Sequence, residues 1–282
     1  MEARPIVQVI YVLRFITGYV LTNPAHVMEP PLLVAAVSWW LAVVAVYAFN
    51  GITDYAEDSA NGSLRPIASG ALGRGAASVT CAAAGATSLA LATQIGSLWP
   101  WLAGYIALGV LYSARPFPAK NRTETAGAVV FGLGFCSYGA GAALAHGPLS
   151  ATGFVFAVVA SCWMATAGTV LKDLSDVEGD AAGGRRTLAV RFGRQAALLV
   201  GVGGALLVGV GGCAAAVLIA PHALGGTIPF ALGALVLVKG FALASKASAT
   251  DRQRQRGSYR VFMRTQFAAN ITILAISLAA AR

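Results

Sequence analysis

The chain has 282 residues, of which 57% are hydrophobic and only 11% are charged, and its mean hydropathy is +0.71. Soluble domains carry about 25% charged residues, so this composition excludes an ordinary soluble domain and predicts a polytopic membrane protein. The formal net charge of +9 does not indicate a nucleic-acid partner, because the topology of a membrane protein already accounts for basic loops.

Nine apolar stretches predict nine transmembrane helices and therefore an all-α fold. Each stretch is close to the roughly 20 residues that an α-helix needs to cross a bilayer, and the alternation typical of strands is absent. The first stretch carries Arg14, and the fourth is short. In chain order the stretches are 6–22, 31–49, 76–95, 99–113, 126–145, 152–171, 195–219, 227–245 and 261–281.

The basic residues predict which side of the membrane each loop faces. The loops after the second, fourth, sixth and eighth stretches contain Lys or Arg, and the loops between them contain none. By the positive-inside rule the basic loops face the cytoplasm, which puts the N-terminus inside and the C-terminus outside. We interpret Arg252, Arg254 and Arg256 as residues that serve this topology. The loops without basic residues lie around His26, Ser97, His146 and His222.

Seven of the eleven acidic residues lie in two short segments, 54–58 and 173–180, each at the end of an apolar stretch on the predicted cytoplasmic side. Carboxylates next to an apolar helix are costly unless they are paired, hydrated or bound to a cation. Asp54 and Asp58 repeat the spacing of Asp176 and Asp180, which indicates an internal duplication whose halves face a shared cavity.

The spacing of these residues predicts that they share helix faces. Asn50, Asp54 and Asp58 are four residues apart and lie on one stripe of a helix. Asp176 and Asp180 repeat this arrangement, and Asp173 precedes Asp176 by three residues. Glu57 and Glu178 lie about 100° off the stripe, so we expect them to face solvent or to lie outside the inner ligand set.

The chemistry of the two segments favours Mg²⁺. Oxygen ligands suit this ion, which usually bridges one or two carboxylates to substrate phosphates. Zinc would require Cys or His ligands, and the four cysteines lie singly inside apolar stretches. Basic residues of the same loops can donate to diphosphate oxygens, although Lys172 can instead pair with Asp176. These basic residues are Arg65, Lys120, Arg122 and Lys172.

A metal, several cations and an apolar cavity together suit the removal of diphosphate from an allylic chain. The allylic cation that remains needs a dry pocket with aromatic faces. Candidates for these faces are Trp39, Trp40, Tyr47, Phe49, Tyr138 and Trp163.

Three stretches carry a resemblance to one family. They are Asn50-x3-Asp54-x3-Asp58 followed by Asn61 and Arg65-Pro-Ile-Ala-Ser-Gly70; Lys172-Asp-Leu-Ser-Asp-Val-Glu-Gly-Asp180 followed by Arg186-Thr-Leu-Ala-Val-Arg-Phe-Gly193; and Tyr112-Ser-Ala-Arg-Pro-Phe-Pro-Ala-Lys120. Together they resemble the signatures of the UbiA superfamily of intramembrane prenyltransferases. The second stretch is most similar in wording to the branch of homogentisate prenyltransferase and chlorophyll synthase.

This resemblance implies a single transmembrane prenyltransferase-like domain over residues 1–282, with nine helices around a central cavity that is capped on the cytoplasmic side. It implies two Mg²⁺ ions, and it implies catalytic roles for Asp54, Asp58, Asp176 and Asp180. The implied metal ligands are Asn50, Asp54, Asp58, Asp173, Asp176 and Asp180. The predicted substrate-binding residues are Asn50, Arg65, Tyr112, Lys120, Arg122 and Lys172, of which Arg122 and Lys172 come from the local charge argument.

Three functions are compatible with the sequence. The first is a Mg²⁺-dependent prenyltransferase that moves a prenyl chain from an allylic diphosphate to an aromatic or other lipophilic acceptor. The second is a terpene cyclase of the same superfamily, because Arg14 is followed by Phe15 and not by the proline of the family's Arg-Pro pair. The third is a carrier or cation transporter, because intramembrane carboxylates also mark ion paths. The sequence predicts neither the acceptor nor the length of the prenyl chain.

Overall fold

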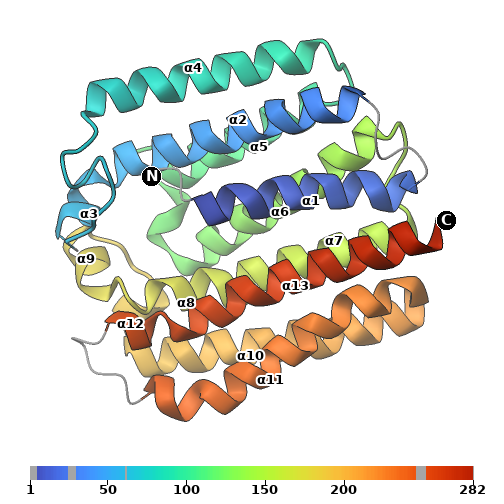
Figure 1. The fold of residues 1–282 in the computed structure, drawn as a ribbon. Coiled ribbons are helices and arrows are strands. Elements are labelled where there is room, and N and C mark those ends of the chain that lie inside the picture. The colour runs from blue at the N-terminus through green and yellow to red at the C-terminus, as the bar shows by residue number, and fades with distance from the viewer. Residues whose placement is uncertain (1–4, 25–29, 61, 246–251, 282) are drawn as a thin grey trace. The chain divides into compact units, whose positions relative to one another are not determined.

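The computed structural model describes residues 5–24, 30–60, 62–245 and 252–281. Within these ranges the chain is almost entirely helical, and the only β-type pairing is an isolated bridge between Arg122 and Arg186. The predicted all-α fold is therefore confirmed. The helices (Figure 1) are α1 Pro5–Thr22, α2 Pro30–Thr53, α3 Tyr55–Ala60, α4 Arg74–Thr93, α5 Trp99–Ser113, η2 Ala119–Asn121, α6 Thr123–Leu144, α7 Ala151–Trp163, η3 Met164–Gly168, α8 Thr169–Asp173, α9 Val177–Ala182, α10 Leu188–Ile219, η4 Pro221–Ala223, α11 Leu224–Ser245, α12 Arg252–Gln255 and α13 Gly257–Ala280.

Each of the nine predicted apolar stretches corresponds to a helix, with α7, η3 and α8 together forming the sixth. In the described part of the chain, eight helices are long and apolar enough to cross a membrane. Of the nine predicted spans, α5 is the one that is too short to be counted among these eight: it has 15 residues and is therefore about 22 Å long. The count of nine spans is thus approximate, because it depends on this short helix.

Proline and glycine set several of the helix boundaries. Pro5 and Pro30 begin α1 and α2, where the missing amide hydrogen costs no intrahelical bond. In α10 the backbone leaves the helical region at Gly193, with φ 82° and ψ 165°. The long part of α10 therefore begins next to the predicted boundary at residue 195.

The helices form two compact units. The first comprises Met1–Ala119, Gly132–Ser150 and Ser277–Arg282, and the second comprises Lys120–Phe131 and Ala151–Ile276. Helix α6 contributes to both units. The expectation of one 282-residue domain stays a prediction.

In the first unit, α1 and α6 approach each other closely. Gly18 and Gly141 make this possible, because a Cβ atom at either position would overlap the backbone of the other helix. Next to this contact, the rings of Phe15 and Trp39 stack with centroids 5.7 Å apart, and Tyr105 lies 4.9 Å from Trp39. These rings form a buried aromatic core between α1, α2 and α5.

In the second unit, Trp163 is the centre of the core. Its ring lies 5.4 Å from Phe230 and stacks on Phe262 at 6.2 Å, and its indole nitrogen donates to the Phe262 carbonyl at 3.3 Å. The π-helical turn η3 follows Trp163 directly and leads into α8. Such turns often occur beside functional sites, and α8 carries the start of the second acidic segment.

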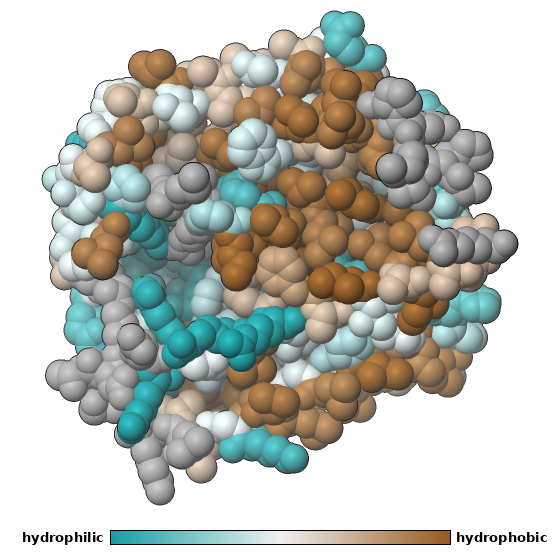
Figure 2. Space-filling view, viewed as in Figure 1, coloured by the Kyte–Doolittle hydropathy of each residue, from teal (hydrophilic) through white to brown (hydrophobic). Residues whose placement is uncertain are grey.

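The outer surface of the second unit suits a lipid environment. Leu199, Leu207, Leu218 and Leu232 of α10 and α11 are all more than half exposed. Figure 2 shows hydrophobic side chains along these two helices and hydrophilic ones towards the end where α12 lies. The distribution fits helices that face hydrocarbon along their length and water at one end.

Candidate functional site

The first acidic segment follows α2 without losing helical backbone hydrogen bonds. The amide of Asp54 donates to the Asn50 carbonyl at 2.9 Å, and the amide of Asp58 donates to the Asp54 carbonyl at 2.8 Å. The three residues are therefore one turn apart although α2 ends at Thr53. Asp54 is buried, with 7% of its surface exposed.

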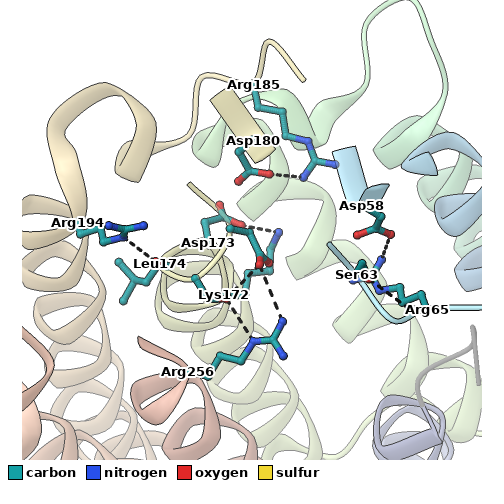
Figure 3. Close-up of polar contacts among 12 residues, drawn as sticks. Asp58, Ser63, Arg65, Lys172, Asp173, Leu174, Asp180, Arg185, Arg194 and Arg256 are labelled. Carbon is teal, nitrogen blue, oxygen red and sulfur yellow. Dashed lines mark hydrogen bonds and ion pairs between the residues drawn. The ribbon is translucent and has the colours of Figure 1, made fainter. Parts of the chain in front are cut away.

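Polar contacts bring several of the predicted site residues together in the first unit. The side-chain nitrogen Nδ2 of Asn50 donates to the Ser113 hydroxyl at 3.0 Å. This bond connects the end of α2 to the end of α5, next to Tyr112. The guanidinium of Arg65 binds Asp58 (Figure 3). The structure thus places Arg65 and Asp58 in direct contact, while their roles in binding diphosphate and metal stay predictions.

Glu57 lies inside the protein. The expectation that it faces solvent is therefore wrong, and the alternative, a place outside the inner ligand set, stays a prediction. It is 7% exposed, and its Oε2 atom has no hydrogen-bond partner. Asp54, which directly precedes α3, and Glu57 within α3 are three residues apart and both buried, whereas Tyr55 is exposed. Helical neighbours at i and i+3 share a face, and this spacing was the signal for Glu57 in the sequence.

The second acidic segment bends between two short helices. Asp173 ends α8, Asp176 occupies the N-cap position of α9 without a capping hydrogen bond from its side chain, and Asp180 lies inside α9. Asp173 and Asp180 are buried, at 5% and 2% exposed. Lys172 binds Asp173 at 2.9 Å, and Arg185 binds Asp180 at 3.0 Å (Figure 3).

The pKa values of the two acidic residues of α9, Glu178 and Asp180, are shifted in opposite directions. Burial raises the pKa of Asp180 to about 7 and the charge of Asp173 adds to the rise, while Arg185 and Lys172 oppose it. Its Oδ2 atom has no partner. Partial burial also acts to raise the pKa of Glu178, but hydrogen bonds from its own amide and from Arg194 outweigh this and lower it. The Glu178 side chain is 67% exposed, which confirms the expectation that it faces solvent.

Two further arginines contact the second segment, and both lie in predicted loops whose basic residues were used above only to assign the topology. Arg194 donates from Nε to the Leu174 carbonyl at 3.1 Å and from Nη2 to Glu178 at 2.6 Å. Arg256 lies 3.9 Å from the Asp176 carboxylate. The interpretation of Arg256 by topology alone is therefore incomplete. No local spacing could have indicated this contact, because the two residues are far apart in the chain.

The third motif ends beside the segment that follows the second motif. The amide of Arg186 donates to the Asn121 carbonyl at 2.7 Å, and the amide of Leu188 donates to the Thr123 hydroxyl at 2.9 Å. Lys120 is 4% exposed, whereas Arg122 is exposed. The structure therefore places Lys120 inside the protein, while the role of Arg122 stays a prediction. His26 and Asn61 lie outside the described residues.

The donor set fits a hard divalent cation. Among the described residues, no three Asp, Glu, His or Cys side chains converge closely enough to enclose an ion. Mg²⁺ does not require such a cage, since it is usually held by one or two carboxylates, water and phosphate oxygens. Glu57 and Asp180 each bury a carboxylate oxygen without a partner. Such an oxygen is costly unless a cation or donor binds it.

A helical membrane protein with two carboxylate segments and their paired cations is the class that the fold and the site define. Residues 11–271 match the sequence profile of the UbiA prenyltransferase family, so the chain belongs to this family. Membership of the family and the long apolar helices make it an integral membrane protein. The resemblance in the three motifs is thereby confirmed.

Two curated relatives carry the same name. The digeranylgeranylglyceryl phosphate synthase of Natronomonas pharaonis is 33% identical over 166 residues, which cover 57% of this chain and 58% of that protein. That of Methanoregula boonei is 33% identical over 202 residues, covering 70% and 69%. The match thus spans less than two thirds of the first relative. Both belong to another branch of the superfamily than the one that the second motif resembles in wording.

A solved structure supports the fold. A UbiA homolog from Archaeoglobus fulgidus, bound to GPP and Mg²⁺, is similar with a TM-score of 0.76 and 17% identity over 99% of this chain and 98% of that one. At this level of identity the likeness shows a shared fold.

Arg14, which is followed by Phe15, is 1% exposed, and its guanidinium lies 4.8 Å from the centroid of the Tyr11 ring. The missing proline after Arg14 is the reason to consider a terpene cyclase. The curated relatives are named as synthases of a prenylated glyceryl phosphate, and the comparisons give the cyclase alternative no support.

Proposed function

We propose that this protein is a Mg²⁺-dependent intramembrane prenyltransferase that transfers a prenyl chain from an allylic diphosphate to a lipophilic acceptor and releases diphosphate. One observation carries the proposal: the buried carboxylates Asp173, at the end of α8, and Asp180, in α9, each contact a neighbouring cation. Asp58 and Arg65 repeat this pairing in the first segment. Membership of the family supports the same function, and so does the homolog that was solved with both GPP and Mg²⁺ bound.

The residues divide into two sets by charge. Oxygen atoms of the acidic set hold Mg²⁺, which when bound neutralises the diphosphate and makes it a better leaving group. The basic set binds the phosphate oxygens directly. The proposed acidic set is Asp54, Asp58, Asp173, Asp176 and Asp180, with Glu57 beside Asp54 and with the neutral amide oxygen of Asn50 as a further ligand. The proposed basic set is Arg65, Lys120, Lys172 and Arg185. Tyr112 adds a neutral donor, and the exposed Arg122 is a further member.

Cleavage of the allylic carbon–oxygen bond sends the electron pair to the diphosphate and leaves a cation on the prenyl chain. Positive side chains stabilise the charge on the leaving group, and aromatic faces stabilise the cation. Tyr47 lies three residues before Asn50, and its ring is 6.2 Å from that of Tyr11. Tyr11 in turn lies 5.5 Å from Tyr105. This aromatic group is a better candidate than Trp40, which is 44% exposed.

The acceptor then bonds to the allylic carbon and loses a proton. The names of the curated relatives direct the first acceptor screen to isoprenoid glyceryl phosphates, with aromatic acceptors next. The basic loops support a site that opens to the cytoplasm, with the N-terminus inside and the C-terminus outside.

Asp54→Asn and Asp176→Asn test the metal assignment. Each substitution keeps the size of the side chain and removes a charge, so pyrophosphate release should fall by at least about 100-fold. Glu124→Gln is the matched control, because Glu124 is 62% exposed and lies 3.6 Å from Arg191. Thermal unfolding in detergent checks that all three variants fold. Full activity in both aspartate variants would overturn the assignment.

A further inference from the structure

Arg256 connects the start of the last helix to the second acidic segment. It lies between α12 and α13, and its Nη2 atom is 3.9 Å from Asp176 Oδ1. Its Nε atom donates to the Ser175 hydroxyl at 3.4 Å, and this hydroxyl donates to Asp176 Oδ1 at 3.2 Å (Figure 3). The three side chains form a triangle that joins Arg256 to two adjacent residues about 80 positions earlier in the chain.

Four acidic side chains of the second segment each have a cationic partner, and the Arg256 pair is the loosest. Lys172, Arg185 and Arg194 bind their carboxylates at 2.9, 3.0 and 2.6 Å, compared with 3.9 Å for Arg256. The Arg256 side chain is 52% exposed, compared with 28%, 9% and 26% for the other three. Attraction falls with distance and with exposure to water, so Arg256 loses least when it leaves its carboxylate.

Arg194 shows why the four cations are not equivalent. Its Nε atom donates to the Leu174 carbonyl, and its Nη2 atom donates to the Glu178 carboxylate. A guanidinium held by two oxygen atoms, one of them charged, orients the acidic segment and has fewer N–H groups left for a ligand than one held by a single hydroxyl. Arg256 is held through Nε by a neutral hydroxyl, which leaves most of its donors near the Asp176 carboxylate available.

We infer that Arg256 is a further diphosphate-binding residue, which turns from Asp176 to the phosphate oxygens while its Nε atom stays on Ser175. The inference rests on the proposed function, because it requires Asp176 to be engaged by Mg²⁺ in the substrate complex. The planar fork of a guanidinium matches two phosphate oxygens at once. The segment before α13 thereby contributes directly to substrate binding.

Binding of inorganic pyrophosphate in the presence of Mg²⁺ tests this inference without any acceptor. Calorimetry on the full-length protein in detergent gives the affinity of the wild type and of the Arg256→Gln and Arg256→Lys variants. Loss of a charge-assisted contact should weaken binding about 10-fold in the Gln variant, and the Lys variant should recover part of it. Arg264→Gln is the control, because Arg264 is an exposed arginine of α13, the helix that follows Arg256, and the affinity of this variant should equal that of the wild type.

The outcomes separate the inference from the proposed function. If the wild type binds pyrophosphate and Arg256→Gln binds it equally well, the inference is overturned and the proposed function stands. If the wild type does not bind pyrophosphate with Mg²⁺, the proposed function fails and the inference fails with it. If Gln and Lys variants both melt at a lower temperature than the wild type and the lysine restores no affinity, Arg256 only anchors α13, which also overturns the inference.

Discussion

Glu57 and Asp180 are buried carboxylates that each have one oxygen without a hydrogen-bond partner. An unpartnered buried acceptor costs about 1–3 kcal/mol, and more when it is charged. Under the proposed function, Mg²⁺ would be the partner of these oxygens. At the scale of residues, the spacing of the aspartates was enough to identify both acidic segments, whereas Glu57 required attention to its i+3 relation to Asp54.

Glu57→Gln should therefore weaken the response to Mg²⁺. The substitution keeps the shape of the side chain but removes the charge of the buried oxygen, so we expect half-maximal pyrophosphate release at about 10-fold higher Mg²⁺. Glu178→Gln provides the comparison, since Glu178 is 67% exposed and binds Arg194 at the surface. Identical Mg²⁺ titrations for the two variants would show that Glu57 does not assist the metal site.

Helices α5, α7 and α10 show how far the apolar pattern determines the elements. Their apolar stretches were predicted at 99–113, 152–171 and 195–219, and each corresponds to observed helix. The pattern could not reveal the π-helical turn inside the predicted 152–171 helix, because hydropathy does not distinguish one helical pitch from another. It also could not reveal the short helical segment before Gly193, whose residues are partly polar.

Gly193→Ala tests the break in α10. At φ 82° and ψ 165° the backbone is in a region that only glycine adopts readily, so an alanine should destabilise the protein by about 1–3 kcal/mol. Gly203→Ala, in the same helix but with open space at its Cβ position, should be neutral or stabilise the helix by up to about 1 kcal/mol. Thermal unfolding in one detergent compares the two. Equal melting temperatures would mean that the break is not required for stability.

At the scale of the whole molecule, the composition predicts the fold, whereas the motifs predict only part of the candidate site. Hydropathy and the positive-inside pattern were sufficient for an all-α membrane protein, because lipid requires helices to satisfy their own backbone. The six metal-ligand candidates followed from spacing and family resemblance. The contact between Arg256 and Asp176 could not be predicted, since it depends on tertiary packing between distant segments.

The most direct test of the central claim is pyrophosphate release by the purified protein in nanodiscs. The reaction would contain Mg²⁺ and an allylic diphosphate, with and without an isoprenoid glyceryl phosphate or aromatic acceptor, and mass spectrometry would identify the products. We predict release that requires both Mg²⁺ and an acceptor, together with a prenylated acceptor among the products. A cyclic terpene formed from the diphosphate alone, or release that persists in excess EDTA, would contradict the account.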